Sequence, residues 1–94
     1  MITYVATIKA LPGKEAELME FGVQLTKEVQ KEEGFLMCIP HISKDDPAEL
    51  VIFEKYKDEQ AHIAHSQSAL MQEAVKKFKD LVAAPPEVKF LSEL

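Results

Sequence analysis

The spacing of apolar and polar residues changes along the chain and marks the elements that we expect. β-Branched and aromatic residues in short runs favour strands, whereas apolar residues three and four positions apart favour helices. The predicted strands cover residues 2–9, 35–42, 49–56 and 88–91. The predicted helices cover residues 14–33 and a second stretch that begins at residue 59 and stops before Pro85. The order of elements is therefore βαββαβ.

Capping residues refine the second helical stretch. Asp58 stands directly before it, where a short carboxylate side chain can accept a hydrogen bond from the first turn. The polar residues 66–68 interrupt the apolar stripe of the stretch and predict a bend there.

The fold class follows from this order and from the faces of the elements. Each predicted helix has one apolar face, so both helices must lie on one side of an antiparallel sheet, and the fold class is α+β, ferredoxin-like. Residues 36–39 and 50–53 are apolar on both faces of their strands. Because an antiparallel sheet normally exposes one face to water, we expect a second copy to cover the other face. Such sheet-to-sheet packing would make the homodimer an α/β-barrel.

Composition narrows the class of protein. The 94 residues suffice for a single domain, residues 1–94. The net charge is −5, with 11 lysines, no arginine and 16 carboxylates, which disfavours nucleic acid and anionic membranes as partners. The one cysteine, Cys38, cannot form a disulfide within the chain, the first residues lack the pattern of a secretion signal, and no apolar run has the length of a membrane span. We therefore expect a cytoplasmic protein.

Four short segments carry a resemblance to a known family. They are Pro-Gly-Lys-Glu at 12–15, Glu-Gly-Phe-Leu at 33–36, Glu-Lys-Tyr-Lys-Asp-Glu at 54–59 followed by Ala61 and His65, and Pro-Glu-Val-Lys-Phe-Leu at 86–91. In this order and spacing the chain resembles the antibiotic biosynthesis monooxygenase domain family. The resemblance implies a dimeric ferredoxin-like fold. It also implies an activity from among cofactor-free quinol and polyketide monooxygenases, haem-degrading enzymes and a sugar-phosphate isomerase.

The chain departs from the family pattern at informative positions. Cys38 stands where many members have tyrosine in the second strand, and Tyr56 stands where many have tryptophan in the third. The haem-degrading branch is recognised by an Asn, a Trp and a His, and this chain has neither Asn nor Trp. Haem degradation is therefore disfavoured, and we expect no cofactor.

His65 is the first candidate for a catalytic residue. On a helix that starts near Asp58 it shares a face with Ala61 and Ala64, whose small side chains let the helix lie close to the sheet. A neutral imidazole in that space can take a proton from a phenol or an enol. The alternative is a structural histidine that bonds a backbone carbonyl or Glu54 and fixes the helix.

Glu54 and Tyr56 fall on one face of the third strand together with Leu50 and Ile52. A carboxylate on an apolar face needs a partner. Glu54 can orient His65, or it can bond across a dimer or to backbone amides in a structural role. Tyr56 can wall a pocket and donate its hydroxyl, or it can fill the core.

The other candidate groups give no metal site. Cys38 and His41 are three positions apart in a strand and point to opposite faces, while His62 and His65 have no evident third ligand. We expect His62 to face solvent, and the acidic runs 31–33 and 45–46 to be solvated surface. Together with Cys38, the apolar residues Phe35 and Met37 are candidates for the wall of a substrate pocket.

The leading hypothesis for function is a cofactor-independent monooxygenase that oxidises a small aromatic hydroquinone or polyphenol with O2. His65 would be the base, and Tyr56 and Glu54 would position the substrate or His65. Two alternatives stay open. One is a non-enzymatic, dimeric ligand-binding or stress-associated module. The other is an isomerase of a small carbonyl compound, against which the lack of arginine counts when the substrate is phosphorylated.

Overall fold

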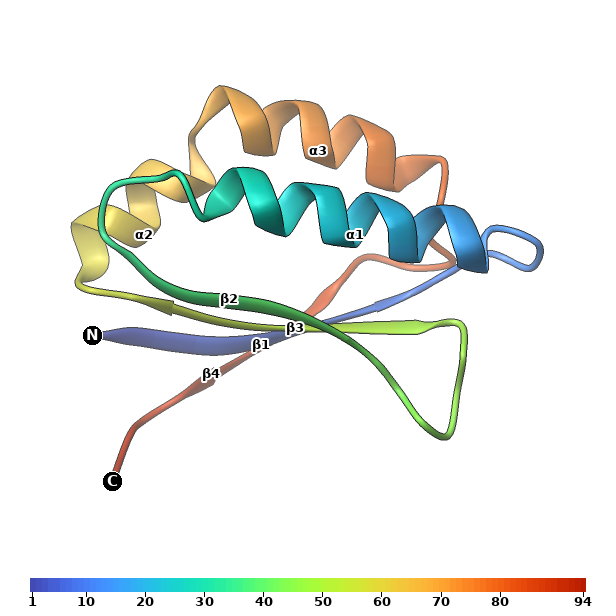
Figure 1. Cartoon of the computed structure of the whole chain (residues 1–94), viewed down its shortest axis with the longest axis horizontal. Coiled ribbons are helices and arrows are strands. Elements are labelled where there is room, and N and C mark those ends of the chain that lie inside the picture. The colour runs from blue at the N-terminus through green and yellow to red at the C-terminus, as the bar shows by residue number, and fades with distance from the viewer.

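The computed structural model describes all 94 residues and confirms the predicted order of strands and helices (Figure 1). The elements are β1 (Ile2–Lys9), α1 (Glu15–Val29), β2 (Phe35–Ile42), β3 (Glu49–Tyr56), α2 (Glu59–Ser66), α3 (Ala69–Lys79) and β4 (Glu87–Leu91). The first helix is shorter than predicted, because the chain leaves it at Val29 and turns through residues 30–34 toward β2.

The second helical stretch is two helices, and side-chain caps explain the division. The Asp58 carboxylate accepts a hydrogen bond from the backbone N–H of Ala61 at 2.8 Å, which confirms the predicted cap of α2. The Ser68 hydroxyl accepts from the N–H of Met71 at 3.2 Å and so caps α3. It also donates to the backbone carbonyl of His65 at 2.8 Å. The bend predicted at residues 66–68 is therefore a helix end followed directly by a helix start.

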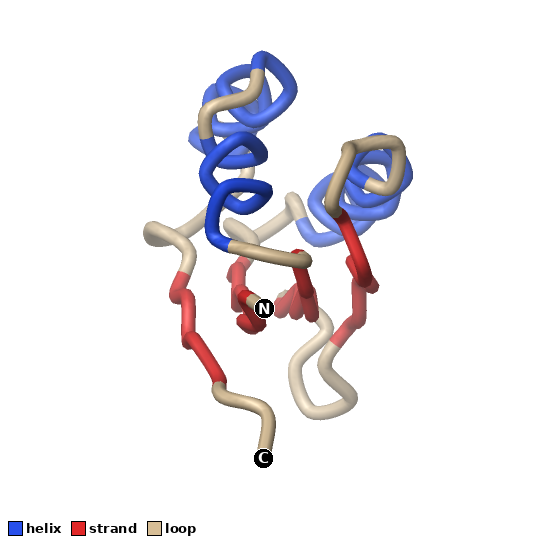
Figure 2. Tube along the Cα trace, turned by 90° about the vertical axis from the view of Figure 1, so that its left-hand side faces the viewer, coloured by secondary structure: helices blue, strands red, loops and turns tan.

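The sheet has four antiparallel strands in the order β2-β3-β1-β4, and the fold is ferredoxin-like. All three helices lie on one side of it, as Figure 2 shows with the helices above the strands. One row of opposed residues crosses all four strands. Cys38 lies opposite Glu54, Glu54 opposite Tyr4, and Tyr4 opposite Phe90. This row brings polar side chains from three strands to the face that the helices cover.

The core lies between the helices and the covered face of the sheet. Its largest fully buried side chains are Leu18, Val29, Leu50, Tyr56 and Leu81. Leu18 and Val29 belong to α1, Leu50 and Tyr56 belong to β3, and Leu81 follows the end of α3. The apolar stripe of α1 and the inward face of β3 therefore bury each other.

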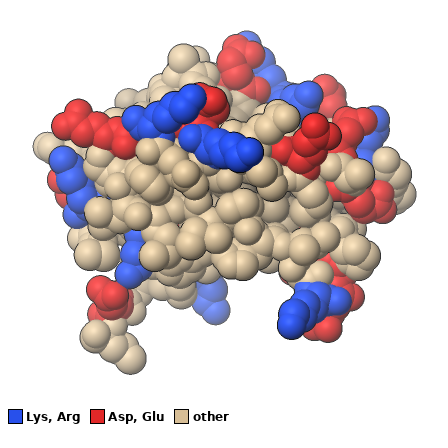
Figure 3. All heavy atoms as spheres, viewed as in Figure 1, with Lys and Arg blue, Asp and Glu red and all other residues tan.

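The opposite face of the sheet stays open in the single chain. Met37 and Ile39 within β2 and Leu91 at the end of β4 remain between 36% and 44% exposed, although they are apolar. Charged side chains gather over the helices in Figure 3, while the band of surface beneath them carries few. The expectation that a second copy covers the open face remains a prediction. None of the helices has the length and apolar character that a membrane crossing requires.

Candidate functional site

A cavity of about 210 Å³ lies between the sheet, α1 and α3. Eleven of its fifteen lining residues are hydrophobic, among them Leu25 and Val29 of α1 and Phe78 of α3. The other four are Thr26, Glu54, His65 and Pro86, and two of the eleven carry a polar group as well, the hydroxyl of Tyr4 and the thiol of Cys38. The site is thus an apolar chamber whose polar groups come mainly from the row across the sheet and from α2.

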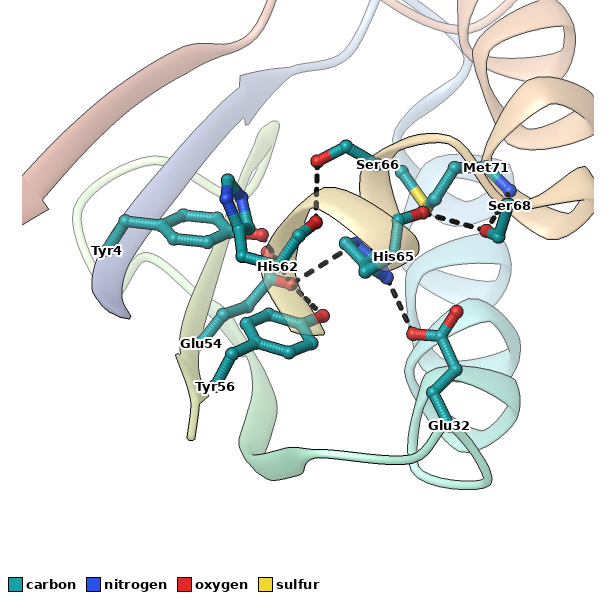
Figure 4. Close-up of polar contacts among 9 residues, drawn as sticks. All are labelled: Tyr4, Glu32, Glu54, Tyr56, His62, His65, Ser66, Ser68 and Met71. Carbon is teal, nitrogen blue, oxygen red and sulfur yellow. Dashed lines mark hydrogen bonds and ion pairs between the residues drawn. The ribbon is translucent and has the colours of Figure 1, made fainter. Parts of the chain in front are cut away.

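Glu54 is the centre of the polar groups. Its side chain is buried, and its Oε1 accepts hydrogen bonds from the hydroxyls of Tyr4 at 2.9 Å and Tyr56 at 3.1 Å (Figure 4). Sequence reasoning required a partner for this carboxyl group, and the structure supplies two tyrosines. Tyr4 lies on the neighbouring strand β1, and Tyr56 lies two residues after Glu54 on β3. The row across the sheet explains the first, since Tyr4 lies directly opposite Glu54.

Burial dominates the electrostatics of this group. It raises the pKa of Glu54 above the ordinary value of 4.5, although the two hydroxyl hydrogen bonds and the neighbouring imidazole of His65 act in the other direction. Burial, followed by the negative charge of Glu54, raises the pKa of Tyr4, Tyr56 and Cys38. The two hydroxyls and the thiol therefore keep their protons at neutral pH, and they can act only as neutral donors or acceptors.

His65 lies between two carboxyl groups that are distant in sequence. Its side chain is 5% exposed, its Nδ1 is 2.6 Å from Oε1 of Glu32, and its Nε2 is 3.7 Å from Oε1 of Glu54 (Figure 4). Ala61, one turn earlier on α2, is buried as predicted. The prediction that Ala64 shares this face is wrong, since Ala64 is exposed.

Glu32 is the first of two residues of the candidate site that sequence reasoning missed. The interpretation of residues 31–33 as solvated surface is wrong for Glu32, whose side chain is only 20% exposed. The turn after α1, in which the N–H of Glu32 donates to the carbonyl of Val29 at 2.9 Å, directs this side chain toward α2. Nothing in the local pattern signals a contact between residues 33 positions apart.

The other predicted site residues are placed unequally. Cys38 and Glu54 line the cavity with His65, while Tyr56 is fully buried behind Glu54 and does not line it. Phe35 and Met37 are not among the lining residues either. Met37 lies opposite Lys55 and next to inward-facing Cys38 in the strand, so its side chain points to the open face. Phe35 lies opposite Tyr56, beyond an irregularity in the register, and packs against the core.

His62 is half-buried, so the prediction that it faces solvent is wrong. Its ring lies 5.1 Å from that of Tyr4 and 5.9 Å from that of Phe90, measured between centroids. Desolvation, and then the neighbouring imidazole of His65, lower its pKa below the ordinary 6.5. No group of three or more His, Cys, Asp or Glu side chains is arranged to hold a metal ion.

Tyr4 is a second residue that sequence reasoning missed. Period-2 counting places it on the same face of β1 as Ala6 and Ile8, so its direction was accessible from the pattern. Its pairing with Glu54 could not be predicted from the pattern, because the pairing depends on the register between β1 and β3.

Comparisons with known proteins agree with the fold and identify the family. The family model described as antibiotic biosynthesis monooxygenase matches residues 1–77. The chain is similar to a Bacillus subtilis protein named "Putative monooxygenase YcnE", with 33% identity over 88 residues that cover 94% of this chain and 93% of that one.

Solved structures give the same result for the fold. A conserved protein from Methanosarcina mazei is 25% identical, with a TM-score of 0.90 over 99% of this chain and 92% of that one. A protein from Nitrosomonas europaea described as a "Putative antibiotic biosynthesis monooxygenase" is 21% identical, with a TM-score of 0.92 over 100% of this chain and 99% of that one. The match of the family model to most of the chain, together with the Bacillus relative, shows that this protein belongs to the antibiotic biosynthesis monooxygenase family.

Proposed function

We propose that this protein is a cofactor-independent monooxygenase that oxidises a small aromatic hydroquinone or polyphenol with O2. The observation that carries the proposal is the position of His65 and Glu54 in the wall of an otherwise apolar cavity. An imidazole beside such a cavity can remove a phenolic proton and leave the anion among mainly apolar side chains.

The size of the cavity supports a small aromatic substrate. An apolar cavity of about 150 Å³ accommodates benzene, and the cavity here measures about 210 Å³. A single substituted ring therefore fits, with its face against apolar side chains such as Leu25 and Phe78 and its hydroxyls toward the polar groups.

The reaction needs no external reductant, because the substrate supplies the electrons. His65 takes one phenolic proton, the electron-rich phenolate gives electrons to O2, and a C–O bond forms at a ring carbon. That carbon then loses its hydrogen as a proton while the O–O bond breaks, and the second oxygen atom leaves as water. A hydroquinone and O2 thus give a hydroxyquinone and water, with one oxygen atom in each product.

The residues divide into one base and its supports. His65 is the base. Glu54 on β3 accepts hydrogen bonds from the hydroxyls of Tyr4 and Tyr56, and it positions the substrate or His65. Tyr56 positions Glu54 from outside the cavity, and Cys38 forms part of the wall as a protonated thiol.

Oxygen consumption tests the proposal. With a panel of one-ring hydroquinones and polyphenols, the wild type should consume O2 faster than the autoxidation blank, and 18O2 should place one label in the quinone and one in water. His65→Ala should lose roughly 10²- to 10⁴-fold in rate, the usual contribution of a general base. His41→Ala is the matched control, because His41 is exposed on β2, and it should retain the wild-type rate. A wild type that never exceeds the blank would refute the proposal.

A ligand-binding module is the second candidate, and Cys38 is the observation that favours it. Cys38 stands where many family members have tyrosine, so the second strand brings a protonated thiol to the cavity instead of a phenolic hydroxyl. This candidate predicts that hydroquinones raise the melting temperature without any product. An isomerase, in contrast, would consume no O2 and would exchange a carbon-bound substrate hydrogen with solvent deuterium.

The open face of the sheet supports a homodimer as part of the same proposal. Met37 and Ile39 expose apolar side chains there, next to half-buried Val51 and Phe53. Light scattering at micromolar concentration should give the mass of two chains, and Ile39→Lys should shift the equilibrium toward the monomer. A monomeric mass for the wild type would refute the dimer.

A further inference from the structure

We propose that Glu32 is a positioning residue for His65: it holds the proton of the neutral imidazole on Nδ1 and thereby leaves Nε2 free to accept a proton. The role in catalysis rests on the function proposed above. The state of the imidazole does not, since it is a property of the protein without substrate.

The contact between the two side chains has the geometry of a strong hydrogen bond. The distance of 2.6 Å between Nδ1 of His65 and Oε1 of Glu32 is slightly shorter than the roughly 2.7–2.9 Å that is usual for a charge-assisted N–H···O bond. An ionised carboxylate can only accept, so the proton lies on Nδ1. The other ring nitrogen, Nε2, is 3.7 Å from Oε1 of Glu54, which is too far for a hydrogen bond.

Burial separates this pair from ordinary surface ion pairs. The side chains of His65 and Glu32 are 5% and 20% exposed, whereas Lys76 and Glu73 on α3 are 73% and 75% exposed. A pair that is largely withdrawn from water is screened less and held more firmly. Glu33, the next residue, is exposed and makes no such contact.

The surrounding fold fixes both partners of the pair. The backbone carbonyl of Gly34 accepts the N–H of Lys57 at 2.9 Å, which joins the turn that carries Glu32 to the segment that leads into α2. On the other side, the Ser68 hydroxyl holds the carbonyl of His65, and the ring of Tyr56 lies 5.0 Å from the imidazole between centroids. The imidazole therefore has little freedom to turn over.

The choice of protonated nitrogen has a chemical consequence. His65 lines the cavity together with Glu54, and Nε2 is the ring nitrogen that lies toward Glu54. A proton on Nδ1 makes Nε2 the basic atom of the ring. Without Glu32, the Oε1 of Glu54 is the remaining carboxyl oxygen near the ring, so Nε2 gains the proton and the ring loses its base on that side.

Nuclear magnetic resonance can read this state directly. The chain has only three histidines, so long-range 1H–15N spectra of the 15N-labelled full chain at neutral pH resolve each ring. We expect wild-type His65 to be neutral with Nδ1 protonated and Nε2 unprotonated. In Glu32→Ala the proton should move to Nε2, while the matched control Glu33→Ala should give the wild-type spectrum.

Two results would overturn the proposal. One is a wild-type His65 that carries its proton on Nε2 or on both nitrogens, a result that requires no variant to fold. The other is a folded Glu32→Ala protein in which His65 keeps the proton on Nδ1.

Kinetics separate this proposal from the proposed function. With an active substrate, Glu32→Ala should lower kcat roughly tenfold or more with little change in KM, within the 10²- to 10⁴-fold that a general base contributes. If no substrate consumes O2, the proposed function fails, while the spectra still decide the role of Glu32. If the wild type is active and the spectra show no change, the role of Glu32 is refuted and the function stands.

Discussion

Gly34 is the position where a single added methyl group should disturb the approach of α2 to the sheet. Its φ is +82°, a conformation that costs an L-residue energy, and a Cβ built there would lie 2.6 Å from the Cβ of Ala61 and 3.2 Å from Cε of Lys57. Gly13 is the matched control, because its φ is +86° and a Cβ there would meet nothing within 4 Å.

The two glycines allow the backbone term and the packing term to be separated. The left-handed conformation costs alanine about 1–2 kcal/mol, and the loss of unfolded-state freedom returns about 0.4–1 kcal/mol. Gly13→Ala should therefore lower the free energy of unfolding by about 0–1.6 kcal/mol. Gly34→Ala adds an overpacking cost of about 1–3 kcal/mol, because Ala61 lies in a capped helix turn and cannot move aside alone.

Urea unfolding of Gly13→Ala, Gly34→Ala, Ala61→Gly and the double variant Gly34→Ala/Ala61→Gly measures these terms. Removal of the Ala61 methyl relieves the contact, so the double-mutant cycle should show a favourable coupling of about 1–3 kcal/mol. The reasoning is refuted if Gly34→Ala costs no more than Gly13→Ala, or if Gly34→Ala and Ala61→Gly are simply additive.

Two further predictions concern the dependence of stability on pH. The raised pKa of Glu54 means that folding favours its protonated form, so its contribution to the free energy of unfolding falls as the pH rises from 4.5 through the raised pKa. Urea unfolding as a function of pH should lose this component in Glu54→Gln and keep it in Glu33→Gln; an unchanged profile in Glu54→Gln would contradict the assignment. The lowered pKa of His62 has the opposite sign, so stability should be lost as the pH falls from 6.5 through the lowered pKa. His62→Leu should remove that loss while the exposed His41→Leu retains it, and equal acid sensitivity of the two variants would show that His62 is not its source.

The secondary structure was accessible from the sequence because its signals are local. Runs of β-branched residues, the apolar stripe of α1 and the cap at Asp58 each depend on neighbours within a few positions. The break between α2 and α3 was visible for the same reason, since Ser68 caps the second helix from within the polar stretch. The end of α1 at Val29 was not visible, because residues 30–33 continue a helix-forming composition up to Gly34.

The residues that line the cavity could be predicted only in part from the sequence. Counting by twos placed Glu54 and Tyr56 on the inward face, but it could not tell that Glu54 reaches the cavity while Tyr56 lies behind it. The irregularity between Phe35 and Met37 breaks the count within β2. A bulge of this kind depends on the pairing partner as much as on the strand itself.

The sequence by itself determined the elements, the ferredoxin-like order, the family and His65 as the first candidate base. The tertiary structure alone decided what surrounds that base. Tyr4 and Glu54 are 50 positions apart in the sequence and meet because of the register between β1 and β3. Glu32 and His65 are 33 positions apart and meet because the turn after α1 directs Glu32 toward α2. Contacts of this range follow from how the elements pack against one another, and no local pattern of residues encodes that packing.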